Sequence, residues 1–282
     1  MIGARLLAGV SRGRLRSHFE HNDGRLMHKW LHYFDIYERH FDAFRRKRPT
    51  VLEIGVFHGG SLEMWRDYFG RGATIIGVDI DERVRSIEDP GFRVVIGDQS
   101  DPVFLQSLAD KYGPFDIVID DGSHVPAHQV ASLTALWPHV KVGGVYLVED
   151  LHTSYWPTYG GGLDVATSFI EWIKSRLDDI NAYHSREPHF QPTEWTKTLG
   201  GLHVYDSIVV LDRADVQKPS VRKTGRPTFA TSNGETTEIE LDGQHLAQLA
   251  LVGSPRARVR RLVRHPIVTT RRVVTRWFRS RR

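Results

Sequence analysis

The chain has 282 residues, of which 40% are hydrophobic and 26% are charged. This composition supports one sizeable α/β core and excludes wholesale disorder. No run of roughly 18 uncharged apolar residues occurs, so the sequence predicts no membrane-spanning helix. Because there is no cysteine, disulfides, thiolate nucleophiles and cysteine-ligated metal centres are excluded, and a cytoplasmic setting is favoured.

The net charge of +4 is unevenly distributed along the chain. Residues 254–282 contain 11 arginines and no acid, which leaves 27 basic and 34 acidic residues in 1–253. Apolar residues within 267–278 can share one helical face, and a basic amphipathic segment suits an anionic membrane surface. A solvated tail and nucleic acid are the alternatives. Nucleic acid is less expected, because nucleic-acid enzymes usually carry positive charge beside the active site.

The first elements predict an N-terminal helical cap over residues 1–48. Arg45-Arg-Lys-Arg-Pro49 ends this cap, because a proline and its predecessor resist helical continuation. We expect the apolar stripe of the cap to lie in the core. In the alternative, His32, Tyr33 and Tyr37 cover a bound cofactor. Apolar residues follow mostly three- and four-residue intervals over 27–44, as in an amphipathic helix: Met27, Trp30, Leu31, Phe34, Tyr37, Phe41 and Phe44.

After residue 49, apolar strand patterns alternate with helical ones. This alternation is typical of a parallel sheet covered by helices on both faces. Residues 201–213 contain two short apolar runs, hinged at Asp206 and Ser207, that predict an antiparallel pair closing the sheet. The expected strands are 50–56, 74–80, 93–97, 115–120 and 144–148, and the expected helices are 60–69, 101–112, 125–137 and 164–184. The expected domains are the cap at 1–48, an α/β domain at 49–215, an extension at 216–253 with a candidate hairpin at 232–235, and the tail at 254–282.

A glycine-rich turn follows the first strand, in Glu53-Ile-Gly55-Val-Phe-His-Gly59-Gly60-Ser61. Glycine lets the backbone approach a ligand and turn sharply into a helix N-terminus. The spacing differs from the G-x-G-x-x-G of dinucleotide enzymes, so alone it also fits a tight structural turn.

Acidic residues close the next two strands. Asp79 ends the second strand, where a carboxylate can accept hydrogen bonds from two ribose hydroxyls. Asp98 ends the third strand, within reach of an adenine amino group. Each acid is also explained as a helix cap, but the glycine turn and both acids in register favour a nucleoside ligand.

The fourth and fifth strands end in a cluster of acids: Asp120 and Asp121, followed by His124, and Glu149 and Asp150. Neighbouring strands lie about 4.8 Å apart, so Asp121 can face the pair on the fifth strand. Such crowding raises a carboxyl pKa unless a cation neutralises the charges, and oxygen ligands suit Mg²⁺ as well as Mn²⁺. His124 is placed to act as a base. In the alternative, the acids cap the next helix and His124 packs.

The glycine turn, together with Asp79 and Asp98, resembles the class I S-adenosylmethionine-dependent methyltransferases over about residues 50–215. The resemblance implies an α/β, Rossmann-like seven-stranded, mostly parallel sheet with the last strand antiparallel. It places the glycine turn and Asp120 toward the methionine part of the cofactor, Asp79 toward the ribose and Asp98 toward the adenine. The implied cofactor-binding residues are Glu53, Gly55, Gly59, Gly60, Ser61, Asp79, Asp98 and Asp120.

The Asp-x-x-His after the fourth strand and the Glu-Asp pair after the fifth resemble a narrower group. These are metal-dependent O-methyltransferases of macrolide sugars and rhamnosyl groups, whose relatives include proteins named as cephalosporin hydroxylases. The resemblance implies that Asp121, Glu149 and Asp150 bind Mg²⁺ and that His124 removes a proton from a sugar hydroxyl.

The expected cofactors are therefore S-adenosylmethionine and Mg²⁺, and the expected partner is a small-molecule or glycolipid sugar acceptor. A lipid-linked acceptor, with the protein peripheral at the inner face of the membrane, follows if the 254–282 tail binds lipid. A homo-oligomer is compatible with the sequence. The alternatives are methylation of a non-sugar natural product or of nucleic acid, and a cofactor-binding scaffold without catalysis.

An aromatic, glycine-rich loop follows Asp150. It contains His152, Tyr155, Trp156 and Tyr159 before three consecutive glycines. Aromatic side chains stack on sugars and glycines provide a hinge, so the loop predicts either a substrate lid or simple packing on the 164–184 helix.

Overall fold

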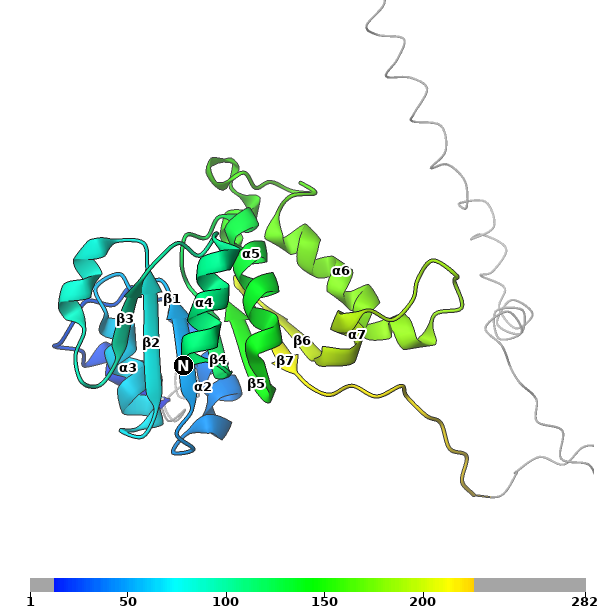
Figure 1. Ribbon diagram of the computed structural model, residues 1–282, viewed down its shortest axis with the longest axis horizontal. Coiled ribbons are helices and arrows are strands. Elements are labelled where there is room, and N and C mark those ends of the chain that lie inside the picture. The colour runs from blue at the N-terminus through cyan, green and yellow to red at the C-terminus, as the bar shows by residue number, and fades with distance from the viewer. Residues whose placement is uncertain (1–12, 226–282) are drawn as a thin grey trace, which may run out of the picture. The chain divides into compact units, whose positions relative to one another are not determined.

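The structure, a computed structural model, describes residues 13–225 and is built on one seven-stranded sheet. The strand order is β3-β2-β1-β4-β5-β7-β6, with β1 to β5 parallel and β7 antiparallel to both of its neighbours (Figure 1). The predicted mostly parallel sheet with an antiparallel last strand is confirmed. The strands are β1 (Thr50–Ile54), β2 (Thr74–Asp79), β3 (Arg93–Ile96), β4 (Phe115–Asp120), β5 (Val140–Val148), β6 (Leu199–Tyr205) and β7 (Ile208–Arg213).

Helices pack on both faces of this sheet, as expected for buried parallel strands. Neighbouring strand residues point to opposite faces, so Val51 joins the core under α1 to α3 while Leu52 joins the core under α4 to α6. The α-helices are α1 (Arg14–Glu20), α2 (Tyr33–Phe41), α3 (Gly60–Phe69), α4 (Pro102–Tyr112), α5 (Pro126–Leu136), α6 (Phe169–Asn181) and α7 (Glu194–Thr198). Short 3₁₀ turns are η1 (Asp42–Phe44), η2 (Glu82–Ile87), η3 (Trp137–His139), η4 (Leu151–Tyr155), η5 (Pro157–Tyr159) and η6 (Ala182–His184).

The predicted helix over 27–44 is wrong at its beginning. Only Tyr33–Phe41 is α-helical, and residues 25–30 form an irregular segment, here called the strap. The strap lies against the start of α3, where a Cβ on Gly60 would lie 2.4 Å from the carbonyl oxygen of Arg25 and 2.5 Å from Cγ of Met27. Burial of Met27 on Gly60 therefore replaces the helical turn that the apolar spacing predicted.

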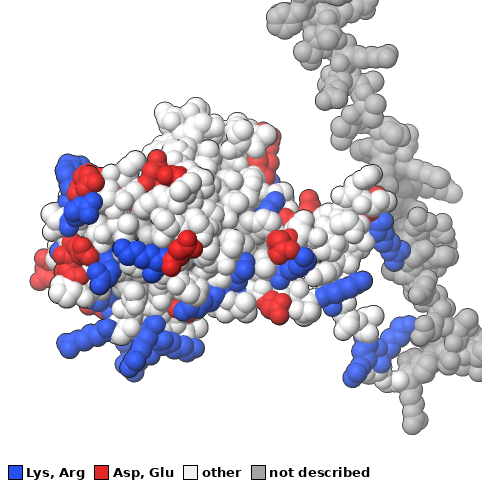
Figure 2. Space-filling model, in the orientation of Figure 1, with Lys and Arg blue, Asp and Glu red and all other residues white. Residues whose placement is uncertain are grey.

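The candidate hairpin at 232–235 and the arginine-rich tail at 254–282 lie outside the described residues. Within residues 13–225, no helix has the length and apolar character needed to span a membrane. On the face that Figure 2 shows, Lys and Arg side chains are interspersed with Asp and Glu. Residues 13–220 all fall in one compact unit, so α1 and α2 share the core of the sheet.

Candidate functional site

A cavity of about 290 Å³ opens beyond the carboxyl ends of β1, β2 and β4. This edge is where ligands bind in open parallel sheets. Glu53, Gly59, Gly60, Asp98, Asp120 and Glu149 do not line the cavity. Six residues singled out from the sequence do line it: Gly55, Ser61, Asp79, Asp121, His124 and Asp150. The strap contributes four more that sequence reasoning missed as site residues: Leu26, Met27, His28 and Lys29.

The turn after β1 depends on glycine at its first position. Gly55 has a φ of +93°, and a Cβ there would lie 2.0 Å from the carbonyl oxygen of Asp121. The turn is also anchored by Asp79, whose Oδ2 accepts hydrogen bonds from the backbone N–H groups of Val56 (2.8 Å) and Phe57 (3.1 Å). Asp79 therefore both shapes the turn and presents its carboxylate to the cavity.

Glu53 lies beneath the turn, fully buried in β1. It accepts a 2.8 Å hydrogen bond from the hydroxyl of Ser61. Burial raises the pKa of Glu53 to about 7, although the charge of Lys29 opposes this shift. The carboxyl group of Glu53 therefore changes its charge near neutral pH, and it lies just behind the cavity wall. Gly59 and Gly60 allow close packing beside the cavity, because side chains at these positions would collide with Ile87 and with the strap.

Asp98 and Asp120 have structural partners within the described residues. Asp98 accepts hydrogen bonds from the backbone N–H (2.7 Å) and hydroxyl (2.8 Å) of Ser100, which lower its pKa. Asp120 is fully buried and accepts from the side chains of Ser132, Gln99 and Tyr146, while burial raises its pKa to about 6. Contact of either carboxylate with a cofactor stays a prediction.

One lysine sits among the predicted metal-binding acids. Nζ of Lys29 donates to Oδ2 of Asp121 (2.5 Å) and to Oε2 of Glu149 (2.9 Å), and its side chain is only 4% exposed. Burial lowers the pKa of Lys29, but the charges of Asp121, Glu149 and Glu53 outweigh burial and hold the pKa well above its ordinary value. Lys29 is therefore a permanent ammonium group between two carboxylates.

Two tyrosines of α2 complete this cluster. Tyr33 donates a 2.6 Å hydrogen bond to Oδ1 of Asp150, and Tyr37, one turn later, donates a 2.7 Å bond to Oε1 of Glu149. Burial raises the pKa of both hydroxyls well above the ordinary value, so both remain donors. Glu149 is itself fully buried, and burial raises its pKa to about 8. From the sequence alone, these tyrosines are expected chiefly in the core and Lys29 has no assigned role, although its position in an aromatic run is the available signal.

His124 and Asp150 meet at the mouth of the cavity. Both have left-handed backbone conformations, with φ of +56° and +54°, and such strain in non-glycine residues is frequent at functional sites. Nε2 of His124 lies 3.6 Å from Oδ2 of Asp150. Nδ1 of His124 is buried and has no hydrogen-bond partner among the described residues.

The predicted metal ligands suit a hard cation. Two of the three, Asp121 and Asp150, lie in one cluster, and its third member is His124, the predicted base, in place of Glu149; the three ligand atoms lie within 4.8 Å of one another. Glu149 stands directly behind them, joined to Asp121 through Lys29. Asp121 and Asp150 face a single ammonium, which leaves an excess of negative charge while Glu149 keeps its proton, and carboxylate oxygens are the ligands that Mg²⁺ prefers.

Half-exposed aromatic side chains flank this cluster. Trp30 of the strap is 55% exposed and Trp156 is 46% exposed. The ring of His152 lies between them, with centroids 6.0 Å from Trp30 and 4.7 Å from Trp156. His152 and Trp156 of the predicted lid loop therefore form one aromatic rim with Trp30 of the strap.

Comparison with known proteins supports the fold. A family model described as a methyltransferase domain matches residues 52–151. Mycinamicin VI 2''-O-methyltransferase of Micromonospora griseorubida is 40% identical over 219 residues, which are 73% of this chain and 53% of that protein. An 8-demethyl-8-alpha-L-rhamnosyl tetracenomycin-C 2'-O-methyltransferase of Streptomyces olivaceus is 43% identical over 198 residues, 66% of this chain and 51% of that protein.

The same relationship appears in three dimensions. A solved structure of MycE methyltransferase from the mycinamycin biosynthetic pathway, in complex with Mg, SAH and mycinamycin VI, superposes with a TM-score of 0.65 and 34% identity. The match covers 84% of this chain and 58% of that one. The chain thus spans about half the length of the curated relatives it matches. Together with the strand order and the glycine turn, these matches show that residues 52–151 form a methyltransferase domain and that the chain is similar to sugar O-methyltransferases.

Proposed function

We propose that the chain is an S-adenosylmethionine-dependent, Mg²⁺-dependent O-methyltransferase that acts on a hydroxyl of a sugar or glycosylated acceptor. The observation that carries this proposal is one shared cavity. Gly55 and Asp79 line its cofactor side, and Asp121, His124 and Asp150 line its acidic side. The relatives described above are named for methylating sugar hydroxyls of natural products.

The cofactor half of the proposal rests on charge and backbone shape. Asp79 would accept hydrogen bonds from the ribose hydroxyls, and the turn at Gly55 would let the methionine part approach the backbone. The positive sulfonium would be favoured by the carboxylates of Asp121 and, behind the wall, Glu53. In this assignment Asp98 lies toward the adenine, while Ser61, Gly59, Gly60 and Asp120 support the shape of the site.

The chemical half needs a base for a weakly acidic hydroxyl. Asp121, Glu149 and Asp150 would hold the Mg²⁺, which when bound supplies a Lewis acid that acidifies and orients a neighbouring sugar hydroxyl. His124 would take the proton of that hydroxyl, since its ring lies at the same cavity. Asp150, whose Oδ2 lies 3.6 Å from Nε2 of His124, would stabilise the imidazolium that forms.

The acceptor would lie against the aromatic rim. Trp30 and Trp156 are half-exposed beside Asp150, and flat aromatic faces suit the apolar faces of sugars. A sugar held there presents its hydroxyls toward His124.

Calorimetric titration with S-adenosylhomocysteine, with and without Mg²⁺, tests the cofactor half of the proposal. We expect binding in both conditions. Methyl transfer to a panel of rhamnosylated and other glycosylated polyketides should then require Mg²⁺ and stop with chelator. Absence of binding in either condition would contradict the methyltransferase assignment, and transfer only to aglycones would contradict the sugar acceptor.

A lipid-linked acceptor is the finer form of this proposal. It rests on the arginine-rich segment 254–282, whose composition suits anionic lipid. Flotation with vesicles containing phosphatidylglycerol should recover the full chain but not a chain ending at Gly253. Equal recovery of the two proteins would remove the membrane from the proposal and leave a diffusible acceptor.

A further inference from the structure

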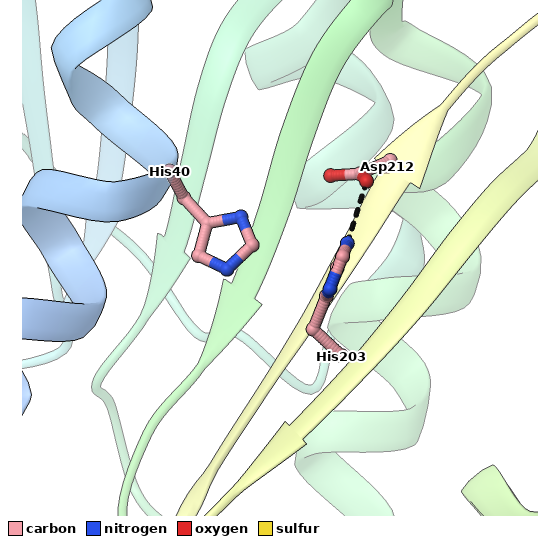
Figure 3. Close-up of side chains that lie close together, drawn as sticks. All are labelled: His40, His203 and Asp212. Carbon is pink, nitrogen blue, oxygen red and sulfur yellow. Dashed lines mark hydrogen bonds and ion pairs between the residues drawn. The ribbon is translucent and has the colours of Figure 1, made fainter.

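A second group of metal-ligating side chains lies outside the cavity. His40 comes from the last turn of α2, His203 from β6 and Asp212 from β7, and the three side chains reach toward one another (Figure 3). Each offers one ligand atom, and the three atoms lie within 4.8 Å of one another. None of the three lines the cavity described above.

We propose that His40, His203 and Asp212 form a binding site for a transition-metal cation, Zn²⁺ foremost. Two imidazole nitrogens and one carboxylate oxygen are a ligand set that Zn²⁺ accepts, with bonds of about 2.0–2.2 Å. Nε2 of His203 lies 2.7 Å from Oδ2 of Asp212 in a direct hydrogen bond, and a bound cation would replace the shared proton between these two atoms. The mixed nitrogen and oxygen set favours Zn²⁺, Co²⁺ or Ni²⁺ over Mg²⁺.

A glycine leaves open space beside these ligand atoms. Gly201 is paired with Asp212 across the β6–β7 ladder. A Cβ on Gly201 would lie 3.1 Å from Oδ2 of Asp212 and 3.4 Å from Nε2 of His203. Glycine therefore keeps clear the position in which a water could stand as a fourth ligand. The side chains of His203 and Asp212 are 40% and 41% exposed, so a cation can reach them from solvent.

His40 is oriented by a hydroxyl partner. Its Nε2 lies 2.9 Å from the hydroxyl of Tyr205, which leaves Nδ1 for a metal. Metal-binding histidines usually use their second ring nitrogen for such a hydrogen bond, because it fixes the ring and the tautomer. The ring of His40 also lies close to that of His203, with centroids 4.7 Å apart.

A cation at this site would join α2 to the β6–β7 hairpin. The same helix carries Tyr33 and Tyr37, whose hydroxyls hold Asp150 and Glu149. Because a ligand that binds only the folded protein stabilises it, metal at His40 would strengthen the attachment of the helix that supports the acidic cluster. The site is independent of the proposed methyl transfer.

Titration of the full, untagged chain with Co²⁺, followed by visible absorption in excess Mg²⁺, tests the site. We expect one saturable Co²⁺ that Zn²⁺ displaces. His203→Ala and the near-isosteric Asp212→Asn should each weaken binding at least tenfold, and Tyr205→Phe by about tenfold, as for other partners of metal ligands. His189→Ala, at an exposed histidine outside the cluster, and Asp121→Asn, in the cavity, should bind Co²⁺ as the unaltered chain does.

Three results would overturn the assignment. These are no saturable Co²⁺ binding by the unaltered chain, full affinity in both His203→Ala and Asp212→Asn, and loss of binding in Asp121→Asn, which would assign the cation to the cavity. Circular dichroism identifies any variant that fails to fold. Because Asp212→Asn changes only one oxygen to nitrogen, it keeps the comparison interpretable if His203→Ala unfolds.

Discussion

Nζ of Lys29 donates a 2.5 Å hydrogen bond to Oδ2 of Asp121, which lies 92 residues further along the chain. The same ammonium reaches Glu149, so it occupies the space between two of the proposed Mg²⁺ ligands. Ammonium and metal ion carry charge of the same sign and use the same carboxylates. The two therefore compete for the cluster, and Lys29 neutralises part of its charge whenever no divalent ion is bound.

Lys29→Met should tighten Mg²⁺ binding by about tenfold. Two unit charges of the same sign 4 Å apart repel by roughly 4 kcal/mol at an effective dielectric constant of 20, and by about twice that when one is Mg²⁺, so a small part of this repulsion corresponds to a tenfold change. Without Mg²⁺ the variant should melt at a lower temperature, because removing one partner of a buried ion pair leaves uncompensated charge. Calorimetric Mg²⁺ titration without cofactor measures the first effect and thermal melting the second.

Lys141→Met is the matched control for that experiment. Lys141 also pairs with a carboxylate, lying 2.7 Å from Asp116 at the start of β4, far along the strand from the cavity. It should leave Mg²⁺ affinity unchanged. If Lys29→Met also leaves the affinity unchanged, the ammonium does not compete with the metal.

His124→Ala should abolish turnover while retaining cofactor binding. A positioned general base contributes about 10²–10⁴-fold to rate, and His124 lines the cavity on its acidic side. Methyl-transfer rates and S-adenosylhomocysteine affinity should both be measured. His128→Ala, which removes a nearby histidine bonded to Ser123, is the control and should keep the rate. A parallel loss of rate and cofactor affinity in His124→Ala would refute the role of base.

Asp79→Ala should weaken cofactor binding before it affects chemistry. Its carboxylate accepts hydrogen bonds from Val56 and Phe57, and bonds to charged groups contribute about 1.5–3 kcal/mol each. We expect at least about a tenfold loss of S-adenosylhomocysteine affinity by calorimetry. Asp81→Ala removes an exposed acid paired with Arg83, outside the cavity, and should bind normally. Unchanged affinity in Asp79→Ala would remove this residue from the ribose site.

Most of the sheet could be predicted because buried parallel strands have continuous apolar sequences. The same logic placed Asp121, His124 and Asp150 at one edge, since the carboxyl ends of parallel strands meet there. The strap could not be predicted this way. Its apolar spacing imitates a helix, but Trp30 is half-exposed and Met27 packs on Gly60, a contact that depends on tertiary structure.

The hydrogen-bond partners of the buried charged groups could not be predicted from the sequence either. Tyr37 reaches Glu149 across 112 positions, and Lys29 reaches it across 120. No local pattern encodes such pairings, because they are created when α2 and the strap pack over the strand ends. The hydrogen bonds that Asp120 accepts from Ser132 and Tyr146 inside the protein are a further pairing of this kind.

Glu53 should make stability fall as pH rises toward neutrality. Burial raises its folded pKa to about 7 from an ordinary 4.5. Between these values the folded chain keeps a proton that the unfolded chain loses, so this contribution is present below pH 4.5 and lost through pH 7. The free energy of unfolding should be measured for the unaltered chain and for Glu53→Gln at pH 5 to 8. Over this range the difference in favour of the unaltered chain should fall by roughly 3 kcal/mol.

An exposed glutamate provides the comparison for Glu53. Glu194→Gln alters a side chain that is 80% exposed, and its stability should stay parallel to that of the unaltered chain across the same pH range. Parallel profiles for Glu53→Gln and the unaltered chain would show that the buried carboxyl titrates no differently on unfolding.

Gly55→Ala and Gly70→Ala separate backbone strain from steric collision. Both glycines have left-handed φ, +93° and +91°, so alanine at either suffers a strain of about 1–3 kcal/mol. At Gly70 a Cβ meets nothing within 4 Å, whereas at Gly55 it would lie 2.0 Å from the carbonyl oxygen of Asp121. Urea denaturation should therefore show a further loss of ~1–3 kcal/mol for Gly55→Ala, and calorimetry should show weakened S-adenosylhomocysteine binding for that variant alone. Equal destabilisation and equal cofactor affinity in the two variants would mean that the close approach of β1 to β4 does not shape the site.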